Sequence, residues 1–395
     1  MPRTTGPRTI PGMNADTDMV TLMADRVREA AGTGTPLRIR GGGSKDFYGQ
    51  SLKGEVLDMA AHAGVVSYEP SELVVTVRGG TLLAELEMLL ALQGQCLPFE
   101  PPHFGPHATV GGMVASGLSG PARASSGAVR DFLLGTVLLN GRGEALSFGG
   151  QVMKNVAGYD VSRLMAGTLG TLGVLLEVSL KVLPVAPGEA TLLCSGLTQQ
   201  ASLDLLNRWG GQPLPLNASC WVHDDNASPA RGFLSVRLRG AVAAVEAACP
   251  RMVADVQAAG GQAAPMDHAQ ANGDWNACHE QTLPFFAQPP ASDACLWRLS
   301  VPQVTPAMDL PYPSLVEWHG GLRWLWAPAS AAGTLRELAR QAGGHATLFR
   351  RPPGTPADLP VFTPLSPVQS RIQRELKKQF DPAGVFNPGR MPMNG

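Results

Sequence analysis

Three consecutive glycines, Gly41 to Gly43, follow a predicted strand at residues 36–39 and precede Ser44 and Lys45 in the segment RIRGGGSK. Glycine loses more backbone freedom on folding than other residues, so a folded chain keeps such a run where backbone must approach something closely. A loop of this kind can turn several backbone N–H groups toward one anion such as a phosphate. An ordinary flexible turn is the alternative, and the loop alone does not decide between the two.

A second segment of small residues, ATVGGMVASG, runs from Ala108 to Gly117. A helix is predicted to begin near Val110, and its glycines and Ala115 fall on one side, so backbone N–H groups and the helix N-terminus can touch a phosphate there. Two such loops suit the two faces of a diphosphate. Close packing of the helix against a strand is the alternative. The sequence contains neither a P-loop nor a Rossmann dinucleotide-binding fingerprint, which argues against both of those folds.

The length and charge of the chain limit its class and its partners. A chain of 395 residues predicts two or three domains. The formal net charge is -1 and no basic run is interleaved with aromatic residues, so a nucleic-acid partner is not expected. The sequence has no signal-peptide core and no run of eighteen apolar residues. We therefore expect a soluble, cytoplasmic protein without a direct membrane span.

Cysteine and histidine spacing does not predict a metal site. The six cysteines are at least seventeen residues apart, which suits reduced thiols in a cytoplasmic protein better than an iron–sulfur motif or a disulfide framework. The one close pair of histidines, His103 and His107, has no third ligand nearby. No bound metal is expected.

Strands and helices alternate along the chain, and its two halves differ in composition. All seven tryptophans lie beyond residue 188, after a predicted linker at 183–189. The second half predicts two rounds of strands and helices, which favours an antiparallel sheet with helices on one face, as in ferredoxin-like α+β domains. The elements expected are helices 18–31, 81–92, 199–209, 241–258, 332–342 and 370–380, and strands 36–39, 55–59, 65–68, 73–78, 133–140, 173–182, 190–195, 232–239, 295–301, 321–327 and 345–351.

Four segments in order resemble the FAD-binding domain of the vanillyl-alcohol oxidase and para-cresol methylhydroxylase superfamily. They are RIRGGGSK, ATVGGMVASG, the stretch from Lys154 to Pro184, and the C-terminal FDPAGVFNPGRM. The resemblance implies an α+β protein: a two-part para-cresol-methylhydroxylase-type FAD-binding domain at 15–187, a ferredoxin-like cap at 188–368, and a C-terminal extension at 369–395 that returns to the FAD domain.

Within that superfamily, GLSGPARASSGAVRDFLLG and GGHATLFR most resemble the E-subunit family of bacterial glycolate oxidases. This resemblance implies oxidation of glycolate to glyoxylate, with electrons passed to a respiratory acceptor. It also implies a larger FAD-containing subunit and an iron–sulfur subunit as partners. Peripheral attachment to the inner face of the plasma membrane through that complex is an alternative to a purely cytoplasmic location.

The resemblance also implies which residues hold the cofactor. The first loop would cradle the FAD pyrophosphate, the second would face its other side or the isoalloxazine, and the strand near Gly173 would lie against the adenosine part. Relatives that tether the flavin use a histidine in the first loop, where this chain has Ser44 and Lys45, so FAD is expected to bind without a covalent link. The cofactor-binding residues implied are Arg40, Gly41, Gly42, Gly43, Ser44, Lys45, Pro101, Thr109, Val110, Gly111, Gly112, Ala115, Gly117, Gly173, Val174 and Asn387.

The catalytic groups are less defined than the cofactor loops. Dehydrogenation of a 2-hydroxy acid needs a proton acceptor, a cation for the carboxylate and the flavin. The metal-binding and proton-accepting histidine motifs of catalytic relatives are absent. His345, Arg350 and Arg351 are the candidates, and the alternative role for the arginines is to brace a subunit contact or a neighbouring carboxylate. Three functions stay open: a flavin-carrying subunit, a self-sufficient dehydrogenase for a small 2-hydroxy acid, and a scaffold that has lost its flavin.

Overall fold

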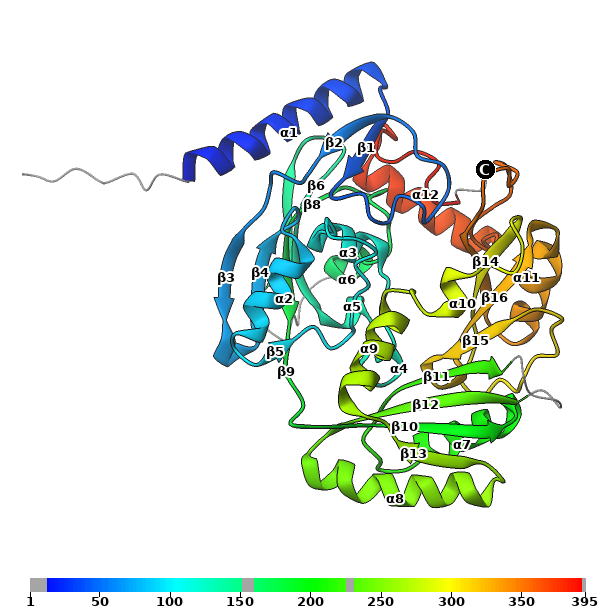
Figure 1. Cartoon of the computed structure of the whole chain (residues 1–395). Coiled ribbons are helices and arrows are strands. Elements are labelled where there is room, and N and C mark those ends of the chain that lie inside the picture. The colour runs from blue at the N-terminus through cyan, green and yellow to red at the C-terminus, as the bar shows by residue number, and fades with distance from the viewer. Residues whose placement is uncertain (1–12, 151–159, 225–230, 393–395) are drawn as a thin grey trace, which may run out of the picture.

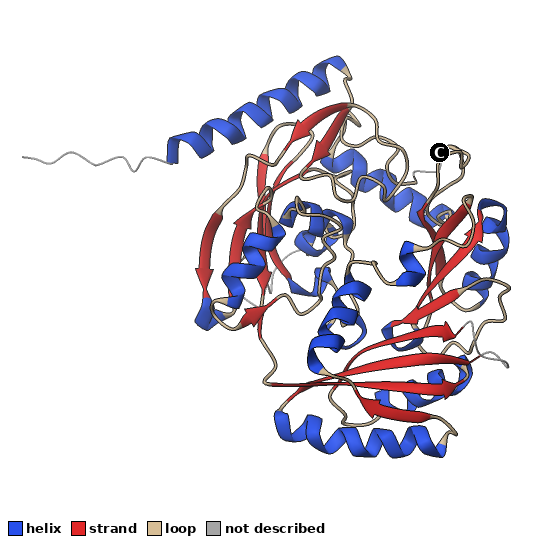
Figure 2. Cartoon of the chain, in the orientation of Figure 1, coloured by secondary structure: helices blue, strands red, loops and turns tan. Residues whose placement is uncertain are grey.

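The computed structural model describes residues 13–150, 160–224 and 231–392, and it consists of two large sheets with helices packed on their faces (Figures 1 and 2). This α+β architecture confirms the fold class expected from the sequence. The start of the Lys154–Pro184 segment, residues 154–159, lies outside the described residues.

The first sheet has five antiparallel strands in the order β3-β4-β8-β6-β7. Short helices pack on one of its faces, and one of them, α3, carries Gly111 and Gly112 of the second glycine-rich segment. The strands are β3 (Val65–Glu69), β4 (Val74–Arg78), β6 (Leu133–Leu139), β7 (Ala145–Gly149) and β8 (Val174–Lys181), and the helices are α2 (Leu83–Ala91), α3 (Val110–Ser116), α4 (Arg123–Ser126), α5 (Val129–Phe132) and α6 (Val161–Leu164).

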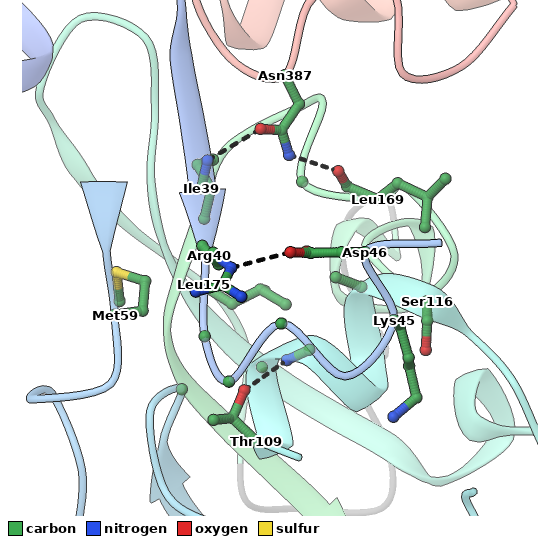
Figure 3. Close-up of a pocket in the computed structure, with 18 of the residues that line it drawn as sticks. Ile39, Arg40, Lys45, Asp46, Met59, Thr109, Ser116, Leu169, Leu175 and Asn387 are labelled. Carbon is green, nitrogen blue, oxygen red and sulfur yellow. Dashed lines mark hydrogen bonds and ion pairs between the residues drawn. The ribbon is translucent and has the colours of Figure 1, made fainter. Parts of the chain in front are cut away.

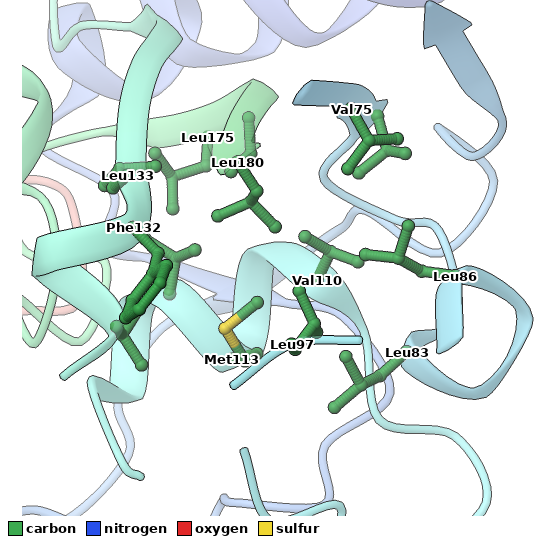
Figure 4. Close-up of a cluster of buried hydrophobic side chains, with 14 of the residues drawn as sticks. Val75, Leu83, Leu86, Leu97, Val110, Met113, Phe132, Leu133, Leu175 and Leu180 are labelled. Carbon is green, nitrogen blue, oxygen red and sulfur yellow. The ribbon is translucent and has the colours of Figure 1, made fainter. Parts of the chain in front are cut away.

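A hydrophobic core lies between this sheet and helices α2 and α3 (Figure 4). Strand β8 separates it from a second core because successive strand side chains point to opposite faces. Leu175 packs with Val110 and Met113 of α3, whereas Val174 and Leu176 pack on the other side. Helix α3 buries its apolar side in this core. Its glycines and Ala115 therefore lie on a different side of the helix, where they can line the site.

The second core joins the two ends of the chain. Helix α1 (Met13–Thr33) and the parallel pair β1 (Leu37–Arg40) and β2 (Glu55–Asp58) pack with Phe386 from the tail that follows α12 (Pro367–Phe380). Two backbone hydrogen bonds, from Leu37 N to Val385 O at 2.7 Å and from Asn387 N to Leu37 O at 2.8 Å, align the tail with β1. The C-terminal return expected from the sequence is therefore present.

The second sheet has eight antiparallel strands in the order β13-β10-β12-β11-β15-β16-β14-β17. Its first four strands have the order fourth, first, third, second along the chain, which is the ferredoxin-like order, and the last four have the same order when read from the β17 edge. Strands β11 and β15 join the two halves. The strands are β10 (Gly188–Leu197), β11 (Leu216–Asp224), β12 (Arg231–Gly240), β13 (Gln262–Pro265), β14 (Ala294–Ser300), β15 (Ser314–Glu317), β16 (Leu322–Pro328) and β17 (His345–Arg350).

Helices cover both faces of the second sheet, whereas the sequence predicted one covered face. Helices α7 (Gln199–Gly210), α8 (Val242–Ala258) and α11 (Ala332–Gln341) pack on the outer face. Helices α9 (His268–His279) and α10 (Pro284–Ala287) pack on the inner face, in a core that also contains Tyr48 and Leu118 of the N-terminal half. The prediction missed them because α9 has almost no apolar side and α10 is a single turn.

The predicted linker at 183–189 is more ordered than its composition indicated. Strand β9 (Leu183–Pro184) pairs with β5 (Gln95–Cys96), and β10 already begins at Gly188. Among the helices of the described residues, none is both long enough and apolar enough to cross a bilayer.

Candidate functional site

The triple-glycine loop follows β1 and is closed by charge pairing at its base. Asp46 Oδ2 accepts hydrogen bonds from Arg38 at 2.6 Å and from Arg40 Nε at 3.0 Å, and the Asp46 amide donates to Gly43 O at 3.0 Å. Gly43 has a φ of +72°, which favours glycine. The loop therefore curves back toward β1 and forms one wall of a cavity (Figure 3).

The backbone N–H groups of this loop are free to bind a ligand. Within the described part of the chain, the amides of residues 41–45 have no hydrogen-bond acceptor. Unpaired backbone amides in a half-buried loop are costly unless something else accepts from them. A run of such amides along a curved loop is the geometry that binds phosphate groups. The loop thus fits an anionic group such as the diphosphate of a dinucleotide.

Helix α3 forms the facing wall, but not with its amides as the sequence suggested. The amide of Val110 donates to Thr81 O at 2.9 Å, that of Gly111 to Gly79 O at 2.8 Å, and that of Gly112 to Thr109 Oγ1 at 3.2 Å. The first amides of α3, which were expected to bind a phosphate, are therefore used within the protein, and two of them attach the helix to the turn between β4 and α2. What α3 presents to the cavity is the small surface of Gly112 and Ala115.

The two glycine-rich segments approach each other backbone to backbone. A Cβ atom on Gly42 would lie 1.5 Å from the carbonyl oxygen of His107, and one on Gly41 would lie 2.3 Å from Thr109 Oγ1. Contacts below 3.0 Å require one of the segments to move. The glycines at 41 and 42 are therefore needed for the shape of the cavity, before any ligand is considered.

The C-terminal tail closes the cavity with a single asparagine. Asn387 Oδ1 accepts from the amide of Ile39 at 2.9 Å, and its Nδ2 donates to Leu169 O at 2.7 Å (Figure 3). Its backbone has a φ of +41°, a conformation that asparagine adopts more readily than most residues. Asn387 thereby fixes three segments that line the cavity: β1, the loop around Leu169 and the tail itself.

Replacement of Asn387 by alanine is expected to weaken FAD binding about tenfold or more, because two hydrogen bonds are lost at about 1 kcal/mol each. A fluorescence titration of the flavin-free chain with FAD measures the change. Asn207→Ala, at an exposed position on α7, is the matched control and should bind FAD like the wild type. Equal affinity of both variants for FAD would show that the two hydrogen bonds of the Asn387 side chain do not shape the cofactor site.

The structure brings most of the sequence-predicted cofactor residues together. Twelve of the sixteen line this one cavity. Pro101 is not among the lining residues, Gly117 ends α3 with a φ of +63°, and the side chains of Val110 and Val174 are buried in the cores on either side of the sheet. The twelve that line it are Arg40, Gly41, Gly42, Gly43, Ser44, Lys45, Thr109, Gly111, Gly112, Ala115, Gly173 and Asn387.

Several lining residues were missed by the sequence analysis. Arg390 donates to Asp46 O at 2.9 Å and to Gln50 O, so the tail also holds the far end of the first loop. Burial lowers the pKa of Arg390 to about 10, which keeps it charged at neutral pH. Asp46 directly follows the recognised segment RIRGGGSK, and Arg390 lies within the recognised segment FDPAGVFNPGRM but was not singled out there.

Lys45 lies at the edge of the cavity and is partly desolvated. Its Nζ donates to His103 O at 3.0 Å and to Ser44 Oγ at 3.3 Å. Burial lowers the pKa of Lys45 to about 8, and the nearby carboxylate of Glu280 opposes that shift. The ammonium is thus mostly charged at neutral pH and adds positive potential beside the loop.

The structure does not bring the three catalytic candidates together. His345 lies at the rim of a second, interdomain cavity that shares Ser116 with the first. Arg350 stacks near the rings of Phe47 and Phe104, with its guanidinium 5.0 and 5.2 Å from their centroids, and burial lowers its pKa to about 10. Arg351 lines neither cavity. Arg350 thus packs against aromatic rings, and neither arginine lines the cofactor cavity.

Comparison with known proteins shows which family this chain belongs to. A family model described as an FAD binding domain matches residues 21–149, which confirms the predicted FAD-binding domain and its cofactor. The glycolate oxidase subunit GlcE of Escherichia coli (strain K12) is 44% identical over 379 residues, covering 96% of this chain and 99% of that protein.

Other relatives match less than half of the chain, or its fold alone. The mitochondrial D-lactate dehydrogenase (cytochrome) of Arabidopsis thaliana is 30% identical over 42% of this chain and 29% of its own length. The glycolate oxidase subunit GlcD of Bacillus subtilis (strain 168) is 31% identical over 33% of this chain and 27% of its own length. The solved structure of an alkyldihydroxyacetonephosphate synthase has a TM-score of 0.65 at 15% identity, covering 93% of this chain and 74% of that one, and shares the fold.

Proposed function

Because the chain belongs to the family of the glycolate oxidase subunit GlcE, we propose that it is the FAD-binding subunit of an enzyme complex that oxidises glycolate to glyoxylate. The observation that carries this proposal is the run of unpaired amides at residues 41–45 along one wall of a cavity whose other wall is made of glycine and alanine. Backbone donors on one side and small residues on the other suit a diphosphate between the two segments.

FAD would be held by the twelve predicted residues that line the cavity, through backbone contacts and shape. The amides of 41–45 would donate to the pyrophosphate, Lys45 would add positive charge, and Gly112 and Ala115 would allow close approach from α3. Gly173 would contact the adenosine part. Ser44 and Lys45 occupy the positions where some relatives carry a tethering histidine, so the link is non-covalent. Bound FAD supplies the acceptor for the hydride that leaves the alcohol carbon.

The proposed partners and location follow from the same family membership. The chain is one subunit of a multi-subunit glycolate oxidase, with a larger FAD-containing subunit and an iron–sulfur subunit as partners. It is cytoplasmic, or attached to the inner face of the plasma membrane through that complex. We keep the domain division at 15–187, 188–368 and 369–395. The change of sheet between β9 and β10, and the pairing of the tail with β1, support it.

One observation favours a second candidate function, a self-sufficient dehydrogenase for a small 2-hydroxy acid. His345 lies at the rim of the interdomain cavity, which shares Ser116 with the cofactor cavity. Burial and the nearby Arg298 and Arg123 lower the pKa of His345, so its imidazole is neutral at neutral pH and can accept a proton. A scaffold without flavin is disfavoured because the first loop keeps its free amides.

The test has two steps on the purified full-length chain. The first measures how much FAD the chain binds, and the proposal expects one FAD per chain. The second adds glycolate without oxygen, first to the chain alone and then with its partner subunits and an artificial electron acceptor. Activity only in the assembled complex supports a flavin-carrying subunit. Rapid bleaching of the flavin in the isolated chain supports the second candidate. A colourless chain that takes up no FAD contradicts both.

A further inference from the structure

A second cavity of about 430 Å³ lies between the two sheets, beside the proposed flavin site. The N-terminal half contributes the segments around Arg123 and Gly167, and the C-terminal half contributes β14, the turn around Trp318 and the start of β17. Its described lining includes three arginines and a histidine but no aspartate or glutamate. A cavity with this excess of basic groups has a positive potential and attracts small anions.

Two of its arginines stack on the same indole ring. The guanidinium of Arg123 lies 4.4 Å from the ring centroid of Trp318, and that of Arg298 lies 5.1 Å from it. In the described residues, neither arginine has a carboxylate within ion-pair distance. Burial lowers the pKa of Arg123, the like charges of Arg298 and Arg130 lower it further, and the carboxylate of Asp131 opposes the shift. An anion between them would remove that repulsion.

The indole that holds the two arginines is itself fixed to the other half of the protein. Trp318 Nε1 donates to Gly120 O at 2.9 Å. The adjacent His319 is hydrogen-bonded on both ring nitrogens, to Ser125 Oγ at 3.0 Å and to Ser219 Oγ at 2.9 Å. The short 3-10 helix at Trp318–Gly320 therefore locks the two halves together. The guanidinium groups are thus preorganised, which lowers the entropy lost when a ligand binds.

Neutral polar groups complete the cavity around the arginines. Ser300 pairs with His345 across β14 and β17, and both line it. Tyr48 is buried beside Arg298, and burial raises the pKa of its hydroxyl, which stays protonated. The carboxyl group of Glu317 is close enough to interact electrostatically with Arg298, but it does not line the cavity. Burial raises the pKa of Glu317 to about 7, so it only partly neutralises the arginine.

We propose that this interdomain cavity binds a small carboxylate anion, with Arg123 and Arg298 as the groups that hold the carboxylate. Two guanidinium groups on one rigid support suit the two oxygens of a carboxylate. Ser300 and His345 offer hydrogen-bond partners to a neighbouring hydroxyl or keto oxygen. The choice of a 2-hydroxy acid as the carboxylate rests on the proposed function, whereas the anion site itself does not.

The test is a calorimetric titration of the full-length, FAD-loaded chain with glycolate, and separately with glycolamide and inorganic phosphate. We expect glycolate to bind and its uncharged amide not to. Arg123→Met and Arg298→Met should each weaken glycolate binding by about tenfold or more, since each removes hydrogen bonds to a charged group. Arg163→Met, an exposed position on α6 that lines neither cavity, should bind glycolate like the wild type.

The outcomes separate this inference from the proposed function. The FAD content of each variant shows whether the cofactor site is intact. Arg123→Lys keeps the charge but loses the paired N–H groups of the guanidinium, so it should bind glycolate with intermediate affinity. Unchanged binding in both methionine variants would overturn the inference. Phosphate binding without glycolate binding would overturn the assignment to a carboxylate. A chain that binds FAD but no glycolate refutes only this inference, and a chain that binds glycolate but no FAD refutes only the proposed function.

Discussion

The Gly42→Val variant is expected to lose its flavin. The Cβ that valine introduces would lie 1.5 Å from the carbonyl oxygen of His107, and a backbone atom cannot rotate away from it. The two walls of the cavity must then separate, at a cost of about 3 kcal/mol, which corresponds to about a hundredfold in affinity. The ratio of flavin to protein absorbance after purification, followed by titration with added FAD, measures the loss.

This expected result has a different physical cause from the one that the sequence suggests. From the sequence alone, the added side chain should collide with the diphosphate or force an unfavourable backbone angle. The structure instead places the collision within the protein, and Gly42 is not among the residues with positive φ. Gly32→Ala is the control because a Cβ there meets nothing within 4 Å. Normal flavin retention by Gly42→Val would contradict the close approach of the two loops.

Replacement of Lys377 by methionine is expected to undock the C-terminal tail. Lys377 is buried, and its Nζ donates to Asp381 Oδ2 at 2.6 Å, Thr171 O at 2.7 Å and Phe386 O at 2.8 Å. Removal of one partner of a buried ion pair costs about 3–5 kcal/mol because the other charge is left uncompensated. The apparent midpoint of thermal unfolding should fall, and FAD affinity should fall with it, since the tail carries Asn387 and Arg390.

Lys378→Met is the control variant for Lys377→Met. Lys378 is the next residue on α12 but is exposed, so its loss should leave both thermal unfolding and FAD affinity unchanged. Limited proteolysis of the tail, followed by mass spectrometry, reports undocking independently of the flavin. If Lys377→Met and Lys378→Met unfolded at the same temperature, the buried cluster around Asp381 would not be what holds the tail.

Local sequence was enough to predict the cofactor loops but not how they are supported. The glycines at 41–43 are required by the backbone of one short loop, so the sequence alone points to them. The use of the α3 amides depends on Gly79 and Thr81, about thirty residues earlier, and only the folded chain shows that contact. Arg390 likewise lies within a recognised segment, but its partner, the carbonyl oxygen of Asp46, belongs to a segment more than 300 residues earlier.

The second sheet and the interdomain cavity were harder to predict for the same reason. Strands β11 and β15 were missed, and they are the two that pair to join the halves of the sheet, so the eight-stranded arrangement could not be inferred without them. Arg123 and Arg298 are 175 positions apart and meet only because both stack on Trp318. No spacing rule connects such residues, whereas a buried ring with two unpaired cations is evident in the structure.

The central claim is that the amides of residues 41–45 hold the pyrophosphate of FAD. A crystal structure of the full-length chain with FAD bound tests it most directly. The account predicts pyrophosphate oxygens within hydrogen-bond distance of amides in that loop, with Gly112 and Ala115 against the opposite side and no covalent bond from Ser44 or Lys45. A pyrophosphate held elsewhere in the chain, with the loop amides still unpaired, would contradict it.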